Sequence, residues 1–290
     1  IYAIEFAQLL ALNLLGRSVY ATANSLSIAS GRVSFALGLH GPCASFETAC
    51  SASLVACHSA VRALQHNECD MHLAAGVNLM LLQASSVGMA IAGMTSIAGR
   101  CHTFDGRADG FARGEGASGV VLTRGTVAVG LGGSAVRQDG RSASLTAPNG
   151  QAQRGLLVAA LADARLAVAS IALSEAHGTG TPLGDPIEAG SLAAAVLHGG
   201  GDLALGGVKG NVAHGESTAG TTGLLKLALG LRCGDAAPNA QLRVLNPHVG
   251  SSLRGVACVA FSPMTIRSFH IGHHVFIYDH ICFMDAHDVF

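Results

Sequence analysis

The chain has 290 residues, of which 50% are hydrophobic and 12% are charged, and its formal net charge is −1. Soluble domains usually carry about 25% charged residues, so we expect much of the surface to be buried, in a layered α/β interior or against another subunit. Because the chain has no run of Lys and Arg, its composition argues against nucleic acid and anionic membranes as partners.

The eight cysteines form no CxxC pair and no regular framework. This pattern favours reduced thiols and predicts an intracellular protein, cytoplasmic or organellar. The chain begins at Ile1 without a basic leader segment, so we expect an N-terminally truncated fragment. Residues 73–99 carry no charge, but polar residues and glycines interrupt them. We therefore expect a buried strand followed by a small-residue loop rather than a membrane span.

The predicted elements begin with an apolar helix within residues 1–15 and a small, polar loop over residues 20–30. Residues 32–37 and 43–46 are predicted to be short extended pieces, because glycine and proline separate them. An apolar stripe at helical spacing then predicts a helix over residues 51–65.

Between residues 71 and 122, the pattern predicts two strands with a charged segment between them. Residues 71–82 are mostly apolar and are expected to form a strand covered on both faces. Residues 99–116 are the most charged part of the chain, and their alternating acids and arginines predict a network of ion pairs. Residues 119–122 return to strand character.

After Arg124 the alternation of strands and helices starts again. We expect strands over residues 127–129, 171–173 and 203–205, helices over 153–164, 186–197 and 218–231, and loops over 140–150 and 206–215. Such alternation predicts an α/β fold with largely parallel, buried sheets. The chain is thereby divided into two halves, residues 1–123 and 124–262, and an atypical tail, residues 263–290, rich in His and aromatic residues.

Cys50 lies where the segment FETACSASL (residues 46–54) turns into the predicted helix. A thiol at a helix N-terminus is exposed to the positive end of the helix dipole, which favours the thiolate. This is the geometry of an activated nucleophile, related to the strand–turn–helix elbow of serine hydrolases. A lone cysteine is more commonly a buried structural residue, but two histidine motifs favour the nucleophile.

The first histidine motif is SEAHGTGTPLGDP (residues 174–186), which follows a short apolar strand. Functional groups of open α/β sheets lie at such strand ends, and flanking glycines allow a ligand to reach His177. Thr179 and Thr181 add hydroxyl groups, so we consider them candidates for substrate binding. The glycine spacing matches neither the P-loop nor the dinucleotide pattern, and a solvent-exposed histidine in a turn is the structural alternative.

The second motif, GVKGNVAHGE (residues 207–216), supplies another imidazole, His214, and a cation, Lys209. A Lys five residues before a His is a weak signal alone. Together with Cys50 and His177, however, His214 and Lys209 complete one candidate site. Glu216 either anchors Lys209 or is an acid at a helix N-terminus, where the dipole favours it.

These motifs resemble the three signatures of β-ketoacyl synthases, in the same order. The residues that carry the resemblance are TACS (48–51), EAHGTGT (175–181) and KGNVAH (209–214). Two further segments, residues 104–116 and 139–150, are more similar to the ketosynthases of modular polyketide synthases than to fatty-acid enzymes. The resemblance covers about residues 20 to 250.

The resemblance implies a thiolase-like, layered α-β-α-β-α fold and a homodimer. It implies that Cys50 is acylated and that a malonyl-type thioester then undergoes decarboxylative Claisen condensation with that acyl group. His177 and His214 would be the catalytic histidines and Lys209 a supporting cation. It implies no metal and no bound cofactor, because phosphopantetheine arrives on an acyl carrier protein or domain.

The sequence departs from the family pattern at three places. Glu47 stands where the family has Asp, and Ala213 stands where Gly usually precedes the second catalytic histidine. Residues 260–264 (AFSPM) replace a glycine-rich turn that supplies an oxyanion N–H group.

Three alternatives stay open at this point. The first is a fatty-acid-type condensing enzyme, which the segment 139–150 argues against. The second is a non-catalytic ketosynthase-like module that binds a carrier protein or a partner subunit; such modules would be expected to lack Cys50. The third is a metal site in the tail, formed by His270, His273, His274 and His280, although histidine-rich tails are more often incidental.

Overall fold

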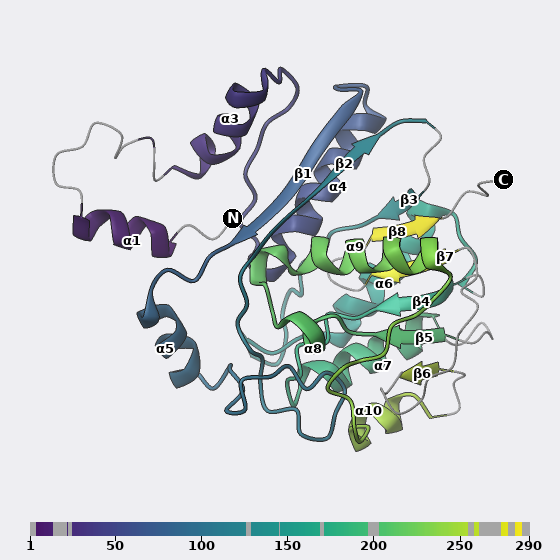
Figure 1. Cartoon of the computed structure of the whole chain (residues 1–290). Helices are drawn as coiled ribbons and strands as arrows, with labels where there is room; N and C mark the ends of the chain where they lie inside the picture. Colours follow the sequence, from purple (N-terminus) through teal and green to yellow (C-terminus); the bar gives the residue numbers. More distant parts are fainter. Residues whose placement is uncertain are drawn as a thin grey trace.

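The computed structural model describes residues 4–13, 22, 25–125, 129–144, 146–168, 171–196, 203–254, 258–260, 274–277 and 282–285. Its elements are drawn in Figure 1. In chain order they are α1 (Ile4–Asn13), α3 (Leu26–Leu37), η1 (Ala49–Ser51), α4 (Ala52–Gln65), β1 (Met71–Asn78), α5 (Gln83–Ile91), β2 (Gly116–Thr123), β3 (Gly130–Ser134), α6 (Gly150–Ala164), β4 (Ile171–Glu175), α7 (Gly184–Val196), β5 (Leu203–Gly206), α8 (Lys209–Val212), η4 (Glu216–Thr218), α9 (Ala219–Cys233), α10 (Pro247–Ser252), β6 (Cys258–Ala260), β7 (His274–Ile277) and β8 (Cys282–Asp285).

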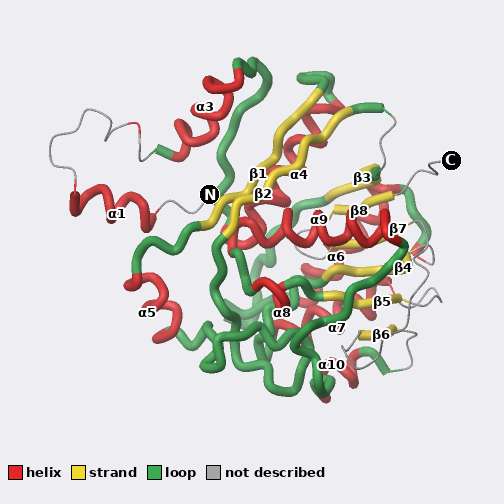
Figure 2. The backbone as a smooth tube through the Cα atoms, viewed as in Figure 1, coloured by secondary structure: helices red, strands yellow, loops and turns green. Residues whose placement is uncertain are grey.

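The strands form two separate sheets, which Figure 2 shows as a long ribbon and a larger sheet. Strands β1 and β2 pair antiparallel, with Met71 opposite Thr123 and Asn78 opposite Gly116. The larger sheet has the order β3-β8-β7-β4-β5-β6. Its strands β7, β4, β5 and β6 are parallel, whereas β8 runs antiparallel to both of its neighbours.

Helices fill the space between the two sheets and cover the far face of the larger one (Figure 1). Helices α4 and α9 lie in the middle layer, and Leu54, Leu224 and Leu227 from them join one buried apolar cluster. At Gly220 an added Cβ would lie 2.5 Å from Leu54 Cγ, so a residue without a side chain is needed where these helices cross. Helices α6 and α7 form the outer layer on the other face of the larger sheet.

The sequence predicted most of the elements that build these layers. Helices α4, α6, α7 and α9 and strands β1, β2, β4 and β5 are confirmed, with ends that differ from the predicted ones by a few residues. Strand β3 begins at Gly130, just after the stretch predicted over residues 127–129, of which 127 and 128 are not among the described residues. The loop predicted over 206–215 contains the short helix α8.

The prediction of a loop and extended pieces between residues 20 and 37 is wrong, because residues 26–37 form helix α3. Gly38, one of the glycines between the two predicted extended pieces, has φ 65° and ends this helix. Its N–H group donates to Phe35 O, and the Leu39 N–H group donates to Ser34 O. These are the hydrogen bonds of a glycine-terminated helix.

Two predictions for the uncharged stretch are also wrong. Strand β1 is covered on one face only, since exposed residues alternate with buried ones such as Ala74 and Asn78. The expected small-residue loop contains helix α5, which no proline interrupts. No helix among the described residues is both long and apolar enough to cross a membrane.

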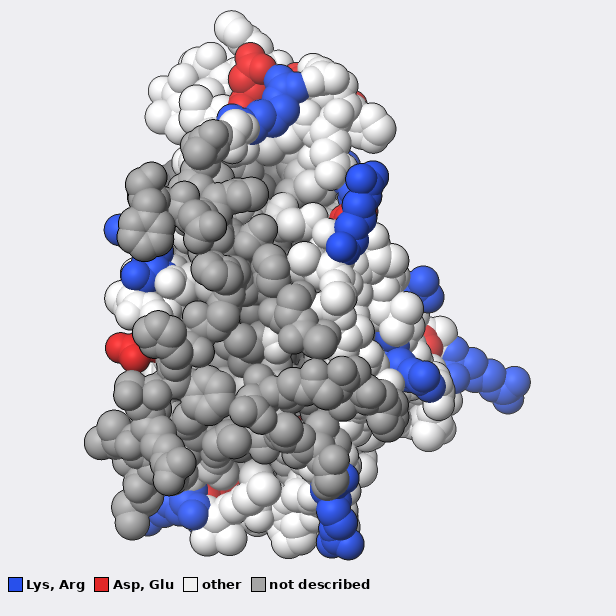
Figure 3. Space-filling view, turned by 90° about the vertical axis from the view of Figure 1, so that its right-hand side faces the viewer, with Lys and Arg blue, Asp and Glu red and all other residues white. Residues whose placement is uncertain are grey.

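Two segments of the predicted tail, β7 and β8, pair into the larger sheet between β3 and β4. Three of the histidines considered for a metal site in the tail, His270, His273 and His280, lie outside the described residues, and for His274 only the backbone is described. On the face shown in Figure 3, the Lys and Arg side chains of the described residues stand apart from one another rather than in a continuous stripe.

Candidate active site

Cys50 sits in a tight turn at the start of helix α4. The preceding residue, Ala49, has φ 54°, a left-handed conformation that reverses the chain direction within one residue. The Ser51 hydroxyl donates to Thr48 O at 2.7 Å and closes the turn. The Cys50 thiol is therefore held at the N-terminal end of a 14-residue helix and is half-buried.

The two histidines come from the ends of neighbouring parallel strands. His177 follows β4, and His214 follows β5 and the short helix α8. Because β4 and β5 pair in parallel, the segments that leave their carboxyl ends emerge at the same edge of the sheet. The His177 and His214 ring centroids are 5.4 Å apart with planes at 89°. The sulfur of Cys50 and one ring nitrogen of each histidine all lie within 4.8 Å of one another.

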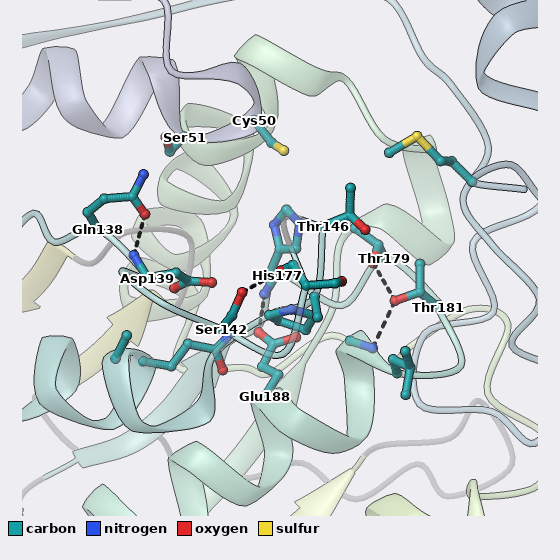
Figure 4. Close-up of a pocket in the computed structure, with 18 of the residues that line it drawn as sticks. Cys50, Ser51, Gln138, Asp139, Ser142, Thr146, His177, Thr179, Thr181 and Glu188 are labelled. Atoms are coloured by element: carbon teal, nitrogen blue, oxygen red, sulfur yellow. Dashed lines mark hydrogen bonds between the residues drawn. The ribbon is translucent and has the colours of Figure 1, made fainter. Parts of the chain in front are cut away.

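A cavity of about 1530 Å³ opens in front of this group. Figure 4 shows the Cys50 sulfur and the His177 side chain facing the same space. The lining combines apolar side chains, among them Val55 and Leu156, with polar residues of the loop before α6 and the predicted substrate-binding residues Thr179 and Thr181. His214 is 3% exposed and lies behind the lining. Its ring packs edge-to-face with that of Phe111, and the two ring centroids are 5.1 Å apart.

Two buried carboxylates hold the loop that carries His177. Glu188 accepts the N–H groups of His177 at 2.5 Å and of Gly178 at 2.9 Å. Asp185 accepts the N–H groups of Phe104 at 2.7 Å and of Gly180 at 3.1 Å. Burial raises the pKa of Glu188 to about 7 and that of Asp185 to about 6.

Neither Asp185 nor Glu188 was predicted from the sequence to belong to the site. Both lie in the first turns of α7, directly after the glycine-rich motif. Acids at the start of a helix usually interact with the helix dipole at the surface, so their burial could not be read from the motif. The position of both acids close behind the first histidine motif is the one available signal.

The backbone of His214 is clamped by a segment from the first half of the chain. The His214 N–H group donates to Ala112 O, and the Gly114 N–H group donates to His214 O, both at 2.8 Å. Between them, Arg113 donates to Glu216 at 2.6 Å and to Glu5 at 3.0 Å. Both partners of Arg113 lie outside residues 99–116, whereas the pair of Arg107 with Asp105 at 2.7 Å belongs to the network predicted within that segment. The Arg113 ion pairs tie α1 to the loop behind the site.

The predicted supporting residues lie close to the site, with contacts that the sequence did not specify. Glu216 is the first residue of η4, directly before α9, so the alternative of an acid at a helix N-terminus is confirmed. Its ion pair with Arg113 was not predicted. Lys209 is 2% exposed, and its carbonyl accepts the N–H group of Ala213. The hydroxyl groups of Thr179 and Thr181 are 3.4 Å apart, and Thr181 also accepts the N–H group of Gly184 at the start of α7.

The sequence and the fold together establish the family. Residues 7–128 match the family description "Beta-ketoacyl synthase, N-terminal domain", and residues 129–243 match "Beta-ketoacyl synthase, C-terminal domain". The chain belongs to the β-ketoacyl synthase family, and its layered α/β architecture is the thiolase-like fold.

Similar proteins are components of polyketide synthases. The chain is 44% identical over 261 residues to a subunit of the phenolphthiocerol/phthiocerol polyketide synthase of Mycobacterium tuberculosis, in a match that covers 87% of this chain and 17% of that protein. A ketosynthase from module 6 of the bacillaene synthase of Bacillus subtilis 168 superimposes with a TM-score of 0.83 at 29% identity, covering 93% of this chain and 50% of that chain.

An oxazolomycin ketosynthase domain from Streptomyces albus JA3453 superimposes with a TM-score of 0.86 at 28% identity. That similarity covers 99% of this chain and 53% of the other. The chain thus spans about half the length of these solved ketosynthases and under a fifth of the mycobacterial protein.

We predict that Ala213→Gly stabilises the protein. Ala213 has φ 64° and ψ −176°, a region of backbone conformation that is essentially restricted to glycine. Relief of this strain should raise the free energy of unfolding by about 1 kcal/mol, measured by urea denaturation. The matched control is Ala90→Gly on an exposed, ordinary helix position of α5, which should lose up to about 1 kcal/mol. If both variants were less stable than the natural protein, the backbone at Ala213 would not be strained.

We predict that Glu188→Gln flattens the pH dependence of stability. Because the folded protein holds the Glu188 proton up to about pH 7 and the unfolded chain releases it near its ordinary value of 4.5, stability falls as pH rises through this window. The variant lacks this contribution, so its unfolding free energy should fall less over the same interval. If the unfolding free energy falls equally with pH in the variant and in the natural protein, the folded protein does not retain the Glu188 proton.

Proposed function

We propose that the chain is a β-ketoacyl synthase of the polyketide type, which accepts an acyl group on Cys50 and condenses it with a malonyl-type thioester. The observation that carries this proposal is the meeting of one thiol and two imidazoles within 4.8 Å, with Cys50 and His177 at the wall of a large cavity and His214 behind it. The polyketide synthases among its relatives favour this type over a fatty-acid condensing enzyme. The nucleophile belongs to the proposed half 1–123 and both histidines to the half 124–262.

The first step transfers an acyl group to Cys50. The thiolate attacks the carbonyl carbon of an acyl thioester, a new carbon–sulfur bond forms, and the carrier thiol leaves with a proton. The N-terminal end of α4 offers backbone N–H groups to the oxyanion. A covalent intermediate divides one difficult acyl transfer into two easier steps.

The second step forms a carbon–carbon bond. A malonyl-type thioester loses CO₂, and the electron pair of the broken bond passes into an enolate. His177 and His214 donate N–H groups to the thioester oxygen, where each donor stabilises the developing charge by about 3 kcal/mol. The enolate carbon then attacks the acyl carbonyl, and Cys50 leaves as a thiolate. Lys209 keeps the histidines oriented and tunes their protonation.

The proposed partners are an acyl carrier protein or domain and a second copy of this chain. The carrier delivers both thioesters on a phosphopantetheine arm, and a cavity of about 1530 Å³ has room for such an arm, so the chain needs no bound cofactor of its own. The intracellular location remains a proposal that rests on reduced thiols. The six cysteines whose side chains are described are free: Cys43, Cys50, Cys57, Cys69, Cys101 and Cys233.

We expect an acyl thioester to add one acyl mass to the chain at Cys50, detected by peptide mass spectrometry, and Cys50→Ala to abolish the addition. His177→Ala and His214→Ala should suppress decarboxylation of a malonyl thioester more than acyl loading, by roughly 100-fold per lost donor. An unmodified natural chain would favour the carrier-binding module. Equal loss of loading and decarboxylation would argue against enolate stabilisation.

The proposed dimer has a candidate surface on α3. No residue of this helix is buried, and among its exposed apolar side chains Phe35 is 91% exposed. Burial of such a surface against a second copy would remove apolar area from water. We expect light scattering to report a dimer for the natural chain and Phe35→Asp to shift it toward the monomer. The control Leu183→Asp changes another exposed apolar residue, at the cavity, and should leave the mass unchanged.

A further inference from the structure

We propose that Cys50, His177 and His214 also form a binding site for one Zn²⁺-like divalent cation, which occupies the unacylated site and blocks acyl loading. The cation acts as a reversible inhibitor and takes no part in the condensation. This inference uses the side chains of the proposed function but does not require that function to be correct. It departs from the sequence analysis, which predicted no metal here.

The three donor atoms are close enough to share one ion. They lie within 4.8 Å of one another, and a tetrahedral zinc ion separates its sulfur and nitrogen ligands by about 3.4–3.6 Å. The remaining adjustment is within the reach of side-chain rotation, since Cys50 is half-buried and faces open space. The perpendicular His177 and His214 rings allow two nitrogens to converge on one point without stacking.

The donor types select the class of metal. A thiolate and two imidazoles are preferred by Zn²⁺ and similar borderline-soft ions, whereas Mg²⁺ and Ca²⁺ prefer oxygen ligands. Two buried carboxyl groups, Asp185 and Glu188, lie behind the His177 loop. Among the described residues, this is the one cluster in which three His, Cys, Asp or Glu donors come this close together.

The cavity provides both an entry path and the fourth coordination position. Three protein ligands with an open fourth position are typical of accessible zinc sites, and Cys50 and His177 line the cavity, which has room for a fourth ligand. Binding forms a metal–sulfur bond and releases the thiol proton to solvent, without oxidation or reduction. The lone pair needed to attack a thioester is then held by the metal, so loading stops until the ion is removed.

The test is a titration of the reduced chain with CoCl₂ in the absence of oxygen. Cobalt replaces zinc in such sites, and we expect the absorption of a cobalt–thiolate bond together with the intense visible bands of a four-coordinate ion. One equivalent of ZnCl₂ should displace the cobalt. Saturating ZnCl₂ should also slow iodoacetamide alkylation of Cys50 by at least about tenfold, and EDTA should restore the rate.

Variants and a chemical block identify the ligands. Cys50→Ser and His214→Ala should each weaken cobalt binding by at least about 100-fold. The control Cys69→Ser, at a half-buried thiol outside the cavity lining, should bind as the natural chain does. The natural chain with its Cys50 already alkylated should show no cobalt–thiolate absorption, which tests the site without any substitution. Binding that survives the loss of Cys50 would overturn the proposal.

The two proposals fail separately. A chain that becomes acylated at Cys50 but gives no four-coordinate cobalt spectrum retains the ketosynthase function and overturns the metal site. A chain that binds cobalt through Cys50 but accepts no acyl group retains the metal site and overturns the ketosynthase function.

Discussion

The position of His177 depends on one buried carboxylate. Glu188 accepts two consecutive backbone N–H groups, those of His177 and Gly178, from the first part of α7. A buried N–H group without an acceptor would cost about 1–3 kcal/mol, so the loop and the helix are fixed to each other. The imidazole is thereby held at the carboxyl end of β4, where the neighbouring strand β5 directs His214 toward the same edge.

Backbone strain is concentrated at the same place. Ala49, Ala213 and Glu216 have positive φ angles beside Cys50 and His214, in conformations that favour glycine. Strained backbone persists where the surroundings hold it in place, and here the surroundings are the Ala112–Gly114 segment and the Arg113 ion pairs. Ala213, which stands where the family usually has Gly, therefore strains the backbone beside His214.

The closeness of the thiol and the imidazoles has two consequences with one physical origin. Side chains that can donate N–H groups to an enolate oxygen can also offer ring nitrogens to a cation, because each imidazole nitrogen serves either role according to its protonation. A thiolate is both a nucleophile and a metal ligand. In the two proposals, acyl loading and metal binding therefore compete for the same electron pair of Cys50.

Local patterns in the chain were sufficient to predict the α/β alternation and to single out Cys50, His177 and His214, because apolar periodicity and motif order are local properties. They also located the charged segment around Arg113. The helical state of α3, the burial of Glu188 and Asp185 beneath His177, and the pairing of Glu216 with Arg113 became known from the three-dimensional arrangement alone. Burial and ion pairing join residues far apart in the chain, as Glu5 and Arg113 show, and no local pattern records which distant segment covers a given side chain.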